Sequence, residues 1–278
     1  MNSHIISRAM IGFYILIFLT YLFGPLILMG VTAFNTPSYP QAFPFEGFTL
    51  EWFVKLWNHR AMMTGLKNSF VIGVGVVFIS VPVGLAAAVI MSQISTKLRG
   101  IYYLVAVSPL LTPGVIIGIS TVIFWKDMMG MSVFTKTTFY KGTILTILGQ
   151  SSFVSVYCLL IISARLQRFD KALEEAALDL GASFSQVFWH ILVPFLRPAL
   201  FSAGIIAFLM SFENYNTTTF SILADKTLVT VLAGEARQGT TPALSALAVV
   251  IIGTSILGAV FFEIYKRREQ KVKNQEAA

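Results

Sequence analysis

Residues 165–198 read RLQRFDKALEEAALDLGASFSQVFWHILVPFLRP and lie between two long apolar stretches of the chain. Asp170 is suited to cap a helix, and the apolar side chains that follow recur at helical spacing. Gly181 stands where a helix end favours a left-handed residue, and Ser183 with Gln186 has the pattern of a capping box. The segment therefore predicts two short helices joined by a glycine turn. The apolar stripe of the first helix consists of Leu173, Ala176, Ala177 and Leu180.

The composition around this segment is that of a membrane protein. Of 278 residues, 56% are hydrophobic and 12% are charged, whereas soluble domains carry roughly 25% charged residues. These values exclude an ordinary soluble domain, a disordered chain and a collagen-like repeat. The single cysteine, Cys158, excludes an intrachain disulfide and a cysteine-based zinc cluster. The net charge of +7 fits loops that face anionic lipid, and it is poor support for nucleic-acid binding.

Gaps between charged residues delimit six apolar stretches, each long enough to cross the hydrocarbon core as a helix. The first is too long for the apolar region of a signal peptide and lacks a convincing cleavage site, so we expect it to be retained. The predicted fold class is an all-α membrane protein, with residues 1–278 forming a single transmembrane domain. The predicted spans cover residues 9–34, 68–92, 100–125, 142–164, 198–222 and 241–262, and the loop before the fifth covers 165–197.

Six spans put both termini on one side of the membrane. With that side inside, twelve Lys and Arg residues lie in inside loops and eight lie outside, which favours cytoplasmic termini. Lys136 is one of the eight, and Lys266, Arg267 and Arg268 form a cytoplasmic cluster directly after the last span. The outside segment around Trp52 is expected to form a short helix at the membrane interface, where tryptophan is favoured.

Glu213 is the single acidic residue within a predicted span. Ionisable residues inside a membrane are costly, so Glu213 is a candidate for the wall of a solute pathway. The alternative is a glutamate near the outer end of the span that bonds to its neighbours or reaches water. Asn214, Tyr215 and Asn216 share the candidate role if the helix opens there.

Two prolines in the third predicted span, Pro109 and Pro113, predict a kinked or interrupted helix. Broken helices commonly line transport cavities, although a kink without a role is the alternative. Gln150 belongs to a polar stripe of the fourth span that either faces a pathway or bonds between helices. These three residues complete the candidate solute pathway. The histidines are scattered, so we expect no metal site, and no catalytic residue is predicted.

The hairpin segment carries a longer motif: EAA at 175–177, glycine at 181 and ILVP at 191–194. This spacing resembles the EAA motif of the membrane subunits of bacterial ABC importers, the binding-protein-dependent permeases. The consensus has leucine where Val193 stands. The resemblance implies six transmembrane helices of the type I ABC importer permease fold, with a cytoplasmic coupling-helix hairpin. On pattern alone, an amphipathic hairpin packed against the protein's own helix ends is the alternative.

In that family the first short helix inserts into a groove of a cytoplasmic ATPase. Small alanines let another backbone approach closely, and an acidic side chain can pair with a cation of the partner. By resemblance, the coupling residues are Glu174, Glu175, Ala176, Ala177, Asp179 and Gly181. The chain has no G-x-x-x-x-G-K-[ST] pattern. We therefore expect no cofactor on this chain, and ATP with magnesium on a separate ATPase subunit.

Within the family the chain most resembles the spermidine/putrescine permeases. The resemblance is carried by FEGFTLEWF at 45–53, LKNSF at 66–70, SPLLTPGVIIGIS at 108–120 and LEEAALDLGAS at 173–183. Polyamine permeases often carry an acidic pair in the fifth span, and this chain has Glu213 followed by an asparagine. A polyamine is the first expectation for the solute, and iron, thiamine, opines and phosphonates are the alternatives.

The resemblance predicts a subunit that forms half of a translocation pathway and works by alternating access, not an enzyme. The expected partners are an ATPase dimer, a second homologous permease chain in a heterodimer, a periplasmic or lipoprotein substrate-binding protein, and membrane lipid, with no nucleic acid. The expected location is the bacterial cytoplasmic (inner) membrane, with both termini in the cytoplasm. An ATPase-independent channel or carrier would need no ATPase-docking hairpin. An intramembrane enzyme would need a catalytic constellation, for which Glu213 alone is available.

Overall fold

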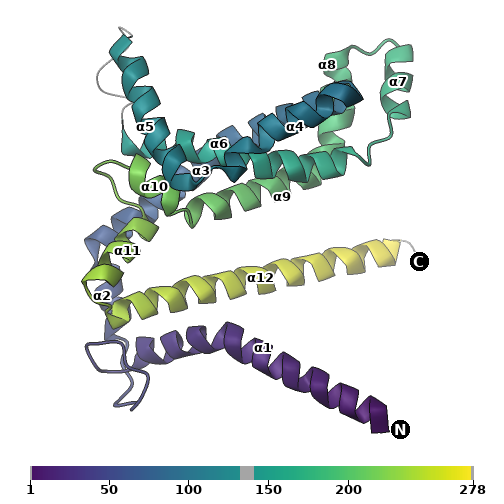
Figure 1. The fold of residues 1–278 in the computed structure, drawn as a ribbon. Coiled ribbons are helices and arrows are strands. Elements are labelled where there is room, and N and C mark those ends of the chain that lie inside the picture. Colours follow the sequence, from purple (N-terminus) through teal and green to yellow (C-terminus); the bar gives the residue numbers. More distant parts are fainter. Residues whose placement is uncertain (1, 132–140, 277–278) are drawn as a thin grey trace. The chain divides into compact units, whose positions relative to one another are not determined.

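The computed structural model describes residues 2–131 and 141–276, and Lys136 lies outside them. The chain divides into two compact units, Met1–Arg60 with Leu232–Ala278 and Ala61–Val231. The predicted single domain stays a prediction. The helices, shown in Figure 1, are α1 (Asn2–Phe34), α2 (Glu51–Asn58), α3 (Arg60–Gln93), α4 (Thr96–Leu111), α5 (Gly114–Met131), α6 (Gly142–Leu166), α7 (Ala172–Asp179), α8 (Phe184–Val187), α9 (Val193–Phe212), α10 (Asn216–Ser221), α11 (Leu228–Gln238) and α12 (Pro242–Glu276).

Within the described residues, four helices are long and apolar enough to cross a membrane. A fifth candidate is the pair α4 and α5, which passes the same test as one span bent by 96°. The apolar part of α12, Pro242–Gly258, is shorter than a full span. The chain is thus an all-helical, multi-span protein, and the count of six crossings stays a prediction. The four continuous candidates are Met10–Phe34, Arg60–Gln93, Gly142–Leu166 and Phe184–Phe212.

The third predicted span is interrupted rather than merely kinked. Helix α4 ends at Leu111, and Thr112 has an extended backbone with φ −83° and ψ 130°. Proline at 113 disfavours the helical conformation at the residue before it, which explains the extended Thr112. The Thr112 N–H still donates to the Pro109 carbonyl, and α5 then begins at Gly114. The two prolines therefore divide this span into two half-helices.

The helical run at the predicted fifth span, 198–222, has other bounds than that prediction. The helical run begins at Phe184 and ends at Phe212, where Glu213 is the C-terminal cap of α9. Asn214 ends this helical run. The Oδ1 atom of its side chain accepts hydrogen bonds from the Thr217 and Thr218 N–H groups at 3.1 and 3.3 Å. Asparagine competes with helical backbone bonding in this way, and α10 then starts separately.

The predicted turn of the hairpin is confirmed, but its second helix is not a separate short one. Gly181 has a positive φ of 87°. Ser183 and Gln186 form both bonds of a capping box at the start of α8. Helix α8 runs through a π-helical turn, Phe188–Leu192, directly into α9. Pro194 cannot donate the helical bond that would reach residue 190, and a wider turn accommodates this loss.

Helix α6 forms the centre of the unit that spans Ala61–Val231. It lies against α9, α10, α5 and α4. Of its most apolar stretch of 18 residues, 61% is buried. Helix α3 passes α6 closely, since a Cβ added at Gly84 would clash with the Cβ of Cys158. The buried side chains of this core include Ile72, Val76, Val154, Leu159, Ile162 and Leu196.

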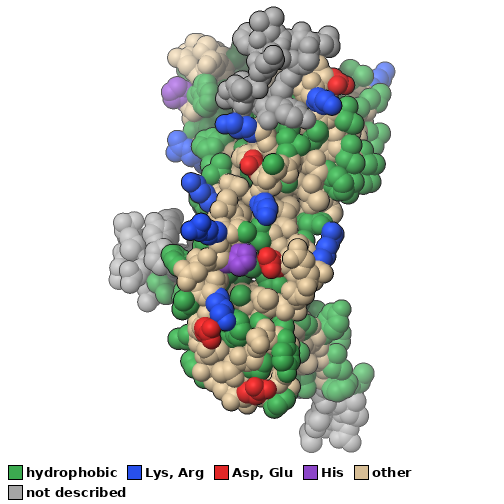
Figure 2. Space-filling view, turned by 90° about the vertical axis from the view of Figure 1, so that its left-hand side faces the viewer, with side chains coloured by type: hydrophobic (Ala, Val, Ile, Leu, Met, Phe, Trp, Pro, Cys, Tyr) green, Lys and Arg blue, Asp and Glu red, His purple; other side chains and the backbone are tan. Residues whose placement is uncertain are grey.

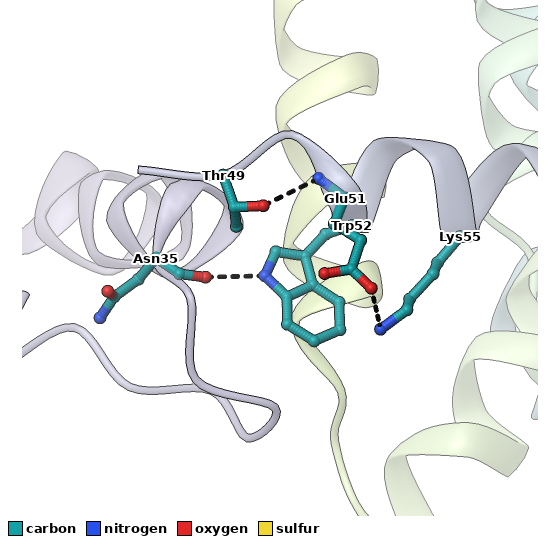
Figure 3. Close-up of polar contacts among 5 residues, drawn as sticks. All are labelled: Asn35, Thr49, Glu51, Trp52 and Lys55. Carbon is teal, nitrogen blue, oxygen red and sulfur yellow. Dashed lines mark hydrogen bonds and ion pairs between the residues drawn. The ribbon is translucent and has the colours of Figure 1, made fainter. Parts of the chain in front are cut away.

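In the other unit, α1 lies beside α12, and the Thr32 hydroxyl donates to Ser245 Oγ at 2.8 Å. The loop after α1 is organised by Asn35, whose Oδ1 accepts backbone bonds from Thr36 and Glu46. The carbonyl of Asn35 accepts a 2.7 Å bond from the Trp52 indole, as Figure 3 shows. The predicted short helix around Trp52 is therefore present as α2, anchored by its tryptophan.

Candidate functional site

The hairpin of α7 and α8 presents an uncovered amphipathic surface on α7. Within α7 no residue is buried. The apolar stripe stays uncovered, because Leu173 is 53% exposed and Leu180 is 90% exposed. In this structure the hairpin therefore does not cover its stripe against the protein's own helix ends. Of the predicted coupling residues, Glu175, Ala176, Asp179 and Gly181 are exposed, while Glu174 and Ala177 are half-buried.

The base of the hairpin is tied to α6 and α9. The guanidinium of Arg165 lies 4.3 Å from the ring centroid of Phe195, and its Nε donates to the Phe195 carbonyl at 3.4 Å. Phe169 packs edge-on against the same ring, with centroids 5.2 Å apart. These contacts join the end of α6 to the start of α9.

Candidate pathway residues gather at the opposite end of α9, around the break that follows Phe212. Helix α9 has 20 residues, which at 1.5 Å per residue separates this break from the hairpin end by about 30 Å. Glu213 and Asn216 are exposed at the break, and Asn214 and Tyr215 are half-buried. The carboxylate of Glu213 is therefore accessible. The side-chain Oδ1 of Asn214, in contrast, accepts the Thr217 N–H and so caps the next helix.

The two interrupted helices meet at this end. A Cβ added at Gly118 of α5 would lie 2.6 Å from the Thr217 carbonyl, and one at Gly114 would lie 2.9 Å from Thr217 Oγ1. The break that contains Pro113 therefore lies against the break that contains Asn214, as the position of α5 beside α10 in Figure 1 shows. Pro113 is exposed and Pro109 is half-buried. Paired half-helices of this kind are typical of binding sites in transporters.

Gln150 is buried beneath this junction instead of being exposed on it. Its Nε2 donates to Thr218 Oγ1 at 2.7 Å, and its Oε1 accepts a bond from the Ser211 hydroxyl. A second buried pair, Thr146 with Ser221, lies at 2.9 Å on the same helices. These bonds fasten α6 to both sides of the α9 break. Sequence reasoning missed Ser211 and Thr218, although both stand in the polar run SFENYNTTTF.

Figure 2 shows acidic side chains dispersed among Lys, Arg and hydrophobic ones rather than gathered into a patch. In the part of the chain that the structure describes, no three His, Cys, Asp or Glu side chains are grouped so that they could hold a metal ion. Glu213 places an exposed carboxylate at the helix break.

Comparison with known proteins identifies the family. Residues 80–274 match the model of the binding-protein-dependent transport system inner membrane component. The putrescine transport system permease protein PotI of Escherichia coli is 27% identical over 264 residues, which cover 93% of this chain and 92% of that protein. The spermidine/putrescine transport system permease protein PotC homolog of Mycoplasma genitalium is 31% identical over 210 residues, which cover 76% and 72%.

The fold agrees with a solved transporter. A chain of a bacterial ABC transporter involved in the import of the acidic polysaccharide alginate has a TM-score of 0.71 at 17% identity, with 96% of each chain covered. The predicted helical fold of an ABC importer permease is thereby confirmed, and permeases of the polyamine branch are among the relatives of the chain. The chain therefore belongs to the family of binding-protein-dependent transport system inner membrane components, and it is a permease subunit of an ABC importer.

Proposed function

We propose that this subunit forms half of the pathway of an ATP-driven polyamine importer and works by alternating access. The observation that carries the proposal is the placement of two features at the two ends of α9. The uncovered α7 stripe stands at one end of α9, and the paired helix breaks with Glu213 stand at the other. A push on the hairpin has a direct mechanical route to the breaks through α6 and α9.

The proposed partner of the hairpin is a cytoplasmic ATPase dimer that holds ATP and magnesium. Leu173 and Leu180 supply apolar surface for a groove, and the exposed Glu175 can pair with a cation on the ATPase. A second, homologous permease chain completes the pathway in a heterodimer, and a periplasmic or lipoprotein binding protein delivers the solute. The proposed location is the bacterial inner membrane, with both termini in the cytoplasm.

The proposed solute is a polyamine such as putrescine or spermidine. The two relatives described above are named for these solutes, and Glu213 offers an exposed carboxylate for an ammonium group. In a site shielded from water this attraction is stronger than in bulk water. The carboxamide of Asn214 caps α10 and leaves Glu213 as the charge that meets the solute.

The test is uptake by the assembled importer in proteoliposomes. The cognate binding protein is first incubated with polyamines, amino acids, phosphonates, thiamine and ferric ion, and its thermal stabilisation identifies the solute. Uptake of the stabilising compound is then measured with ATP and with a non-hydrolysable analogue inside the vesicles. We expect stabilisation by a polyamine and uptake with ATP only. Stabilisation by a different class of compound would reject the solute, and uptake without hydrolysis would reject the ATP-driven mechanism.

A further inference from the structure

Helix α2 has two apolar faces, and the rest of its unit covers one of them. Trp52 and Leu56 are each 5% exposed and pack into the unit that contains α1 and α12. At about 100° per residue, Leu50, Val54 and Trp57 share another face, and they are 55%, 58% and 77% exposed. The tryptophan around which the sequence predicts an interfacial helix is therefore turned inward, and a second tryptophan stands on the uncovered face.

A charged strip separates the two apolar faces. Glu51 and Lys55 lie between them around the helix axis and form an ion pair at 2.8 Å, drawn in Figure 3. Their side chains are 62% and 52% exposed, so this strip is open to solvent. An uncovered apolar face beside a charged strip is typical of a helix that lies at a membrane surface, with its apolar side in the lipid.

Contacts with the end of α1 place this face at the depth of the membrane surface. The candidate span Met10–Phe34 ends at Phe34, where a spanning helix leaves the hydrocarbon. The Thr49 N–H donates to the Phe34 carbonyl at 2.9 Å. The Phe34 ring also packs against Phe48 and Phe53, with ring centroids 5.4 and 5.2 Å apart. The segment that leads into α2, and the start of α2 itself, are therefore held at the end of the span.

The apolar surface of α1 continues onto α2 through these rings. Ile27, which is 63% exposed, lies two turns before Phe34 on the same face of α1. Phe48 stacks on Phe34 and is itself 69% exposed, and Phe53 lies one turn before Trp57 on α2. A bilayer that surrounds α1 therefore also reaches the uncovered face of α2.

We propose that Phe48, Leu50, Val54 and Trp57, here called the α2 patch, insert into the headgroup region of the bilayer. The occupant is lipid rather than a protein chain, because the patch has no charge and continues the surface of a spanning helix. Its exposed tryptophan is also a side chain favoured at the headgroup level. The insertion fixes the depth of α2 and of α12, against which α2 lies. This role is independent of the solute.

The experiment measures the environment of single spin labels in the assembled importer in nanodiscs, without the binding protein. One label replaces Val54 in the patch, and the matched label replaces Lys55, the next residue, on the charged strip. The native Cys158 is fully buried and should not take the label. We expect the Val54→Cys label to collide mainly with oxygen, which concentrates in lipid, and the Lys55→Cys label to collide mainly with a water-soluble nickel chelate.

The other results of this measurement would overturn the proposal. Access of the nickel chelate to the Val54→Cys label would place the patch in water, where a binding protein could reach it. Access of neither reagent would show that a protein chain, such as the second permease, covers the patch.

Two variants and one control test the patch itself. Phe48→Ser with Trp57→Ser removes both of its rings, and we expect nickel access at the Val54→Cys label to rise several-fold. Trp57→Ser alone keeps the ring that packs on α1 and should act in the same direction. Tyr39→Ser with Phe43→Ser removes two aromatic side chains of the preceding loop, 60% and 78% exposed, that are outside the patch, and it should leave the label unchanged. An unchanged label in both patch variants contradicts the proposal.

Discussion

Gly181 shows how one backbone angle shapes the proposed coupling site. Its φ of 87° is a left-handed conformation, and a Cβ added there meets nothing within 4 Å. A substitution at this position therefore acts through backbone strain of about 1–3 kcal/mol and not through a clash. The strain is largest for a β-branched residue and small for asparagine, which tolerates this conformation.

We predict that Gly181→Val abolishes ATP-dependent uptake while Gly181→Asn retains most of it. The valine changes the angle at which α7 leaves the hairpin, and the asparagine preserves that angle. Uptake into proteoliposomes is the measurement, and the amount of co-purified ATPase reports whether α7 still docks. Equal uptake by the two variants would show that the turn geometry does not matter for coupling.

Glu213 tests the charge at the helix break. Glu213→Gln keeps the shape and hydrogen bonding of the side chain but removes its charge. Loss of a charge-assisted bond is worth about 1.5–3 kcal/mol, so we expect uptake of a polyamine to fall roughly ten- to a hundredfold. Basal ATP hydrolysis by the assembled complex should stay near normal, because the break is remote from the hairpin.

The matched control for this change is Glu51→Gln. Glu51 is an exposed glutamate of α2 that pairs with Lys55 at 2.8 Å, and exposed pairs contribute little. We expect this variant to transport normally. Near-normal polyamine uptake by Glu213→Gln, or an equal loss in both variants, would leave Glu213 without a role in binding the solute.

At the scale of elements, the break between α9 and α10 depends on the cap that Asn214 provides. Asn214→Ala leaves the Thr217 and Thr218 N–H groups without their side-chain acceptor. Loss of such a cap costs about 0.5–2 kcal/mol, which we expect to lower the melting temperature of the chain in nanodiscs. Asn214→Asp keeps the acceptor and should melt like the wild type, and so should Asn216→Ala at the exposed neighbour. A normal melting temperature for Asn214→Ala would mean that the cap is not needed for the break.

The sequence predicts these elements well where the interactions that shape them join residues only a few positions apart. The Ser183 capping box, the Gly181 turn and the interruption at Pro113 each follow from side chains and backbone near the site. The end of α9 at Phe212 was not predicted, because the apolar stretch after Arg197 was delimited by its charged residues, which do not reveal a polar side chain that caps the next helix. Asn214 carries that signal, since asparagine favours caps over helix interiors.

The position of Gln150 could not be derived in the same way. A polar stripe on an apolar helix fits either a solute pathway or contacts between helices. The choice depends on residues 61 and 68 positions away, Ser211 and Thr218, which occupy both ends of its amide. Contacts of that separation are set by how α6, α9 and α10 pack, and no local pattern in the sequence carries this information.

At the scale of the whole molecule, the proposed function depends on which side of the membrane the hairpin faces. The chain offers a direct test, because its single cysteine, Cys158, is fully buried and should not react with a polar maleimide. Ser185 in the hairpin and Ser38 in the loop after α1 are both exposed. Ser185 is preferable to Ser183, whose hydroxyl forms the capping box.

We predict that Ser185→Cys is labelled by an impermeant maleimide only after the membrane is opened, and that Ser38→Cys is labelled in intact spheroplasts. The unmodified chain, in which Cys158 is buried, is the control for background labelling. The reasoning joins two independent arguments, the excess of Lys and Arg in the predicted inside loops and the need of α7 to reach an ATPase. Labelling of Ser185→Cys in intact spheroplasts would reverse the orientation, and α7 would then be unable to dock on a cytoplasmic ATPase.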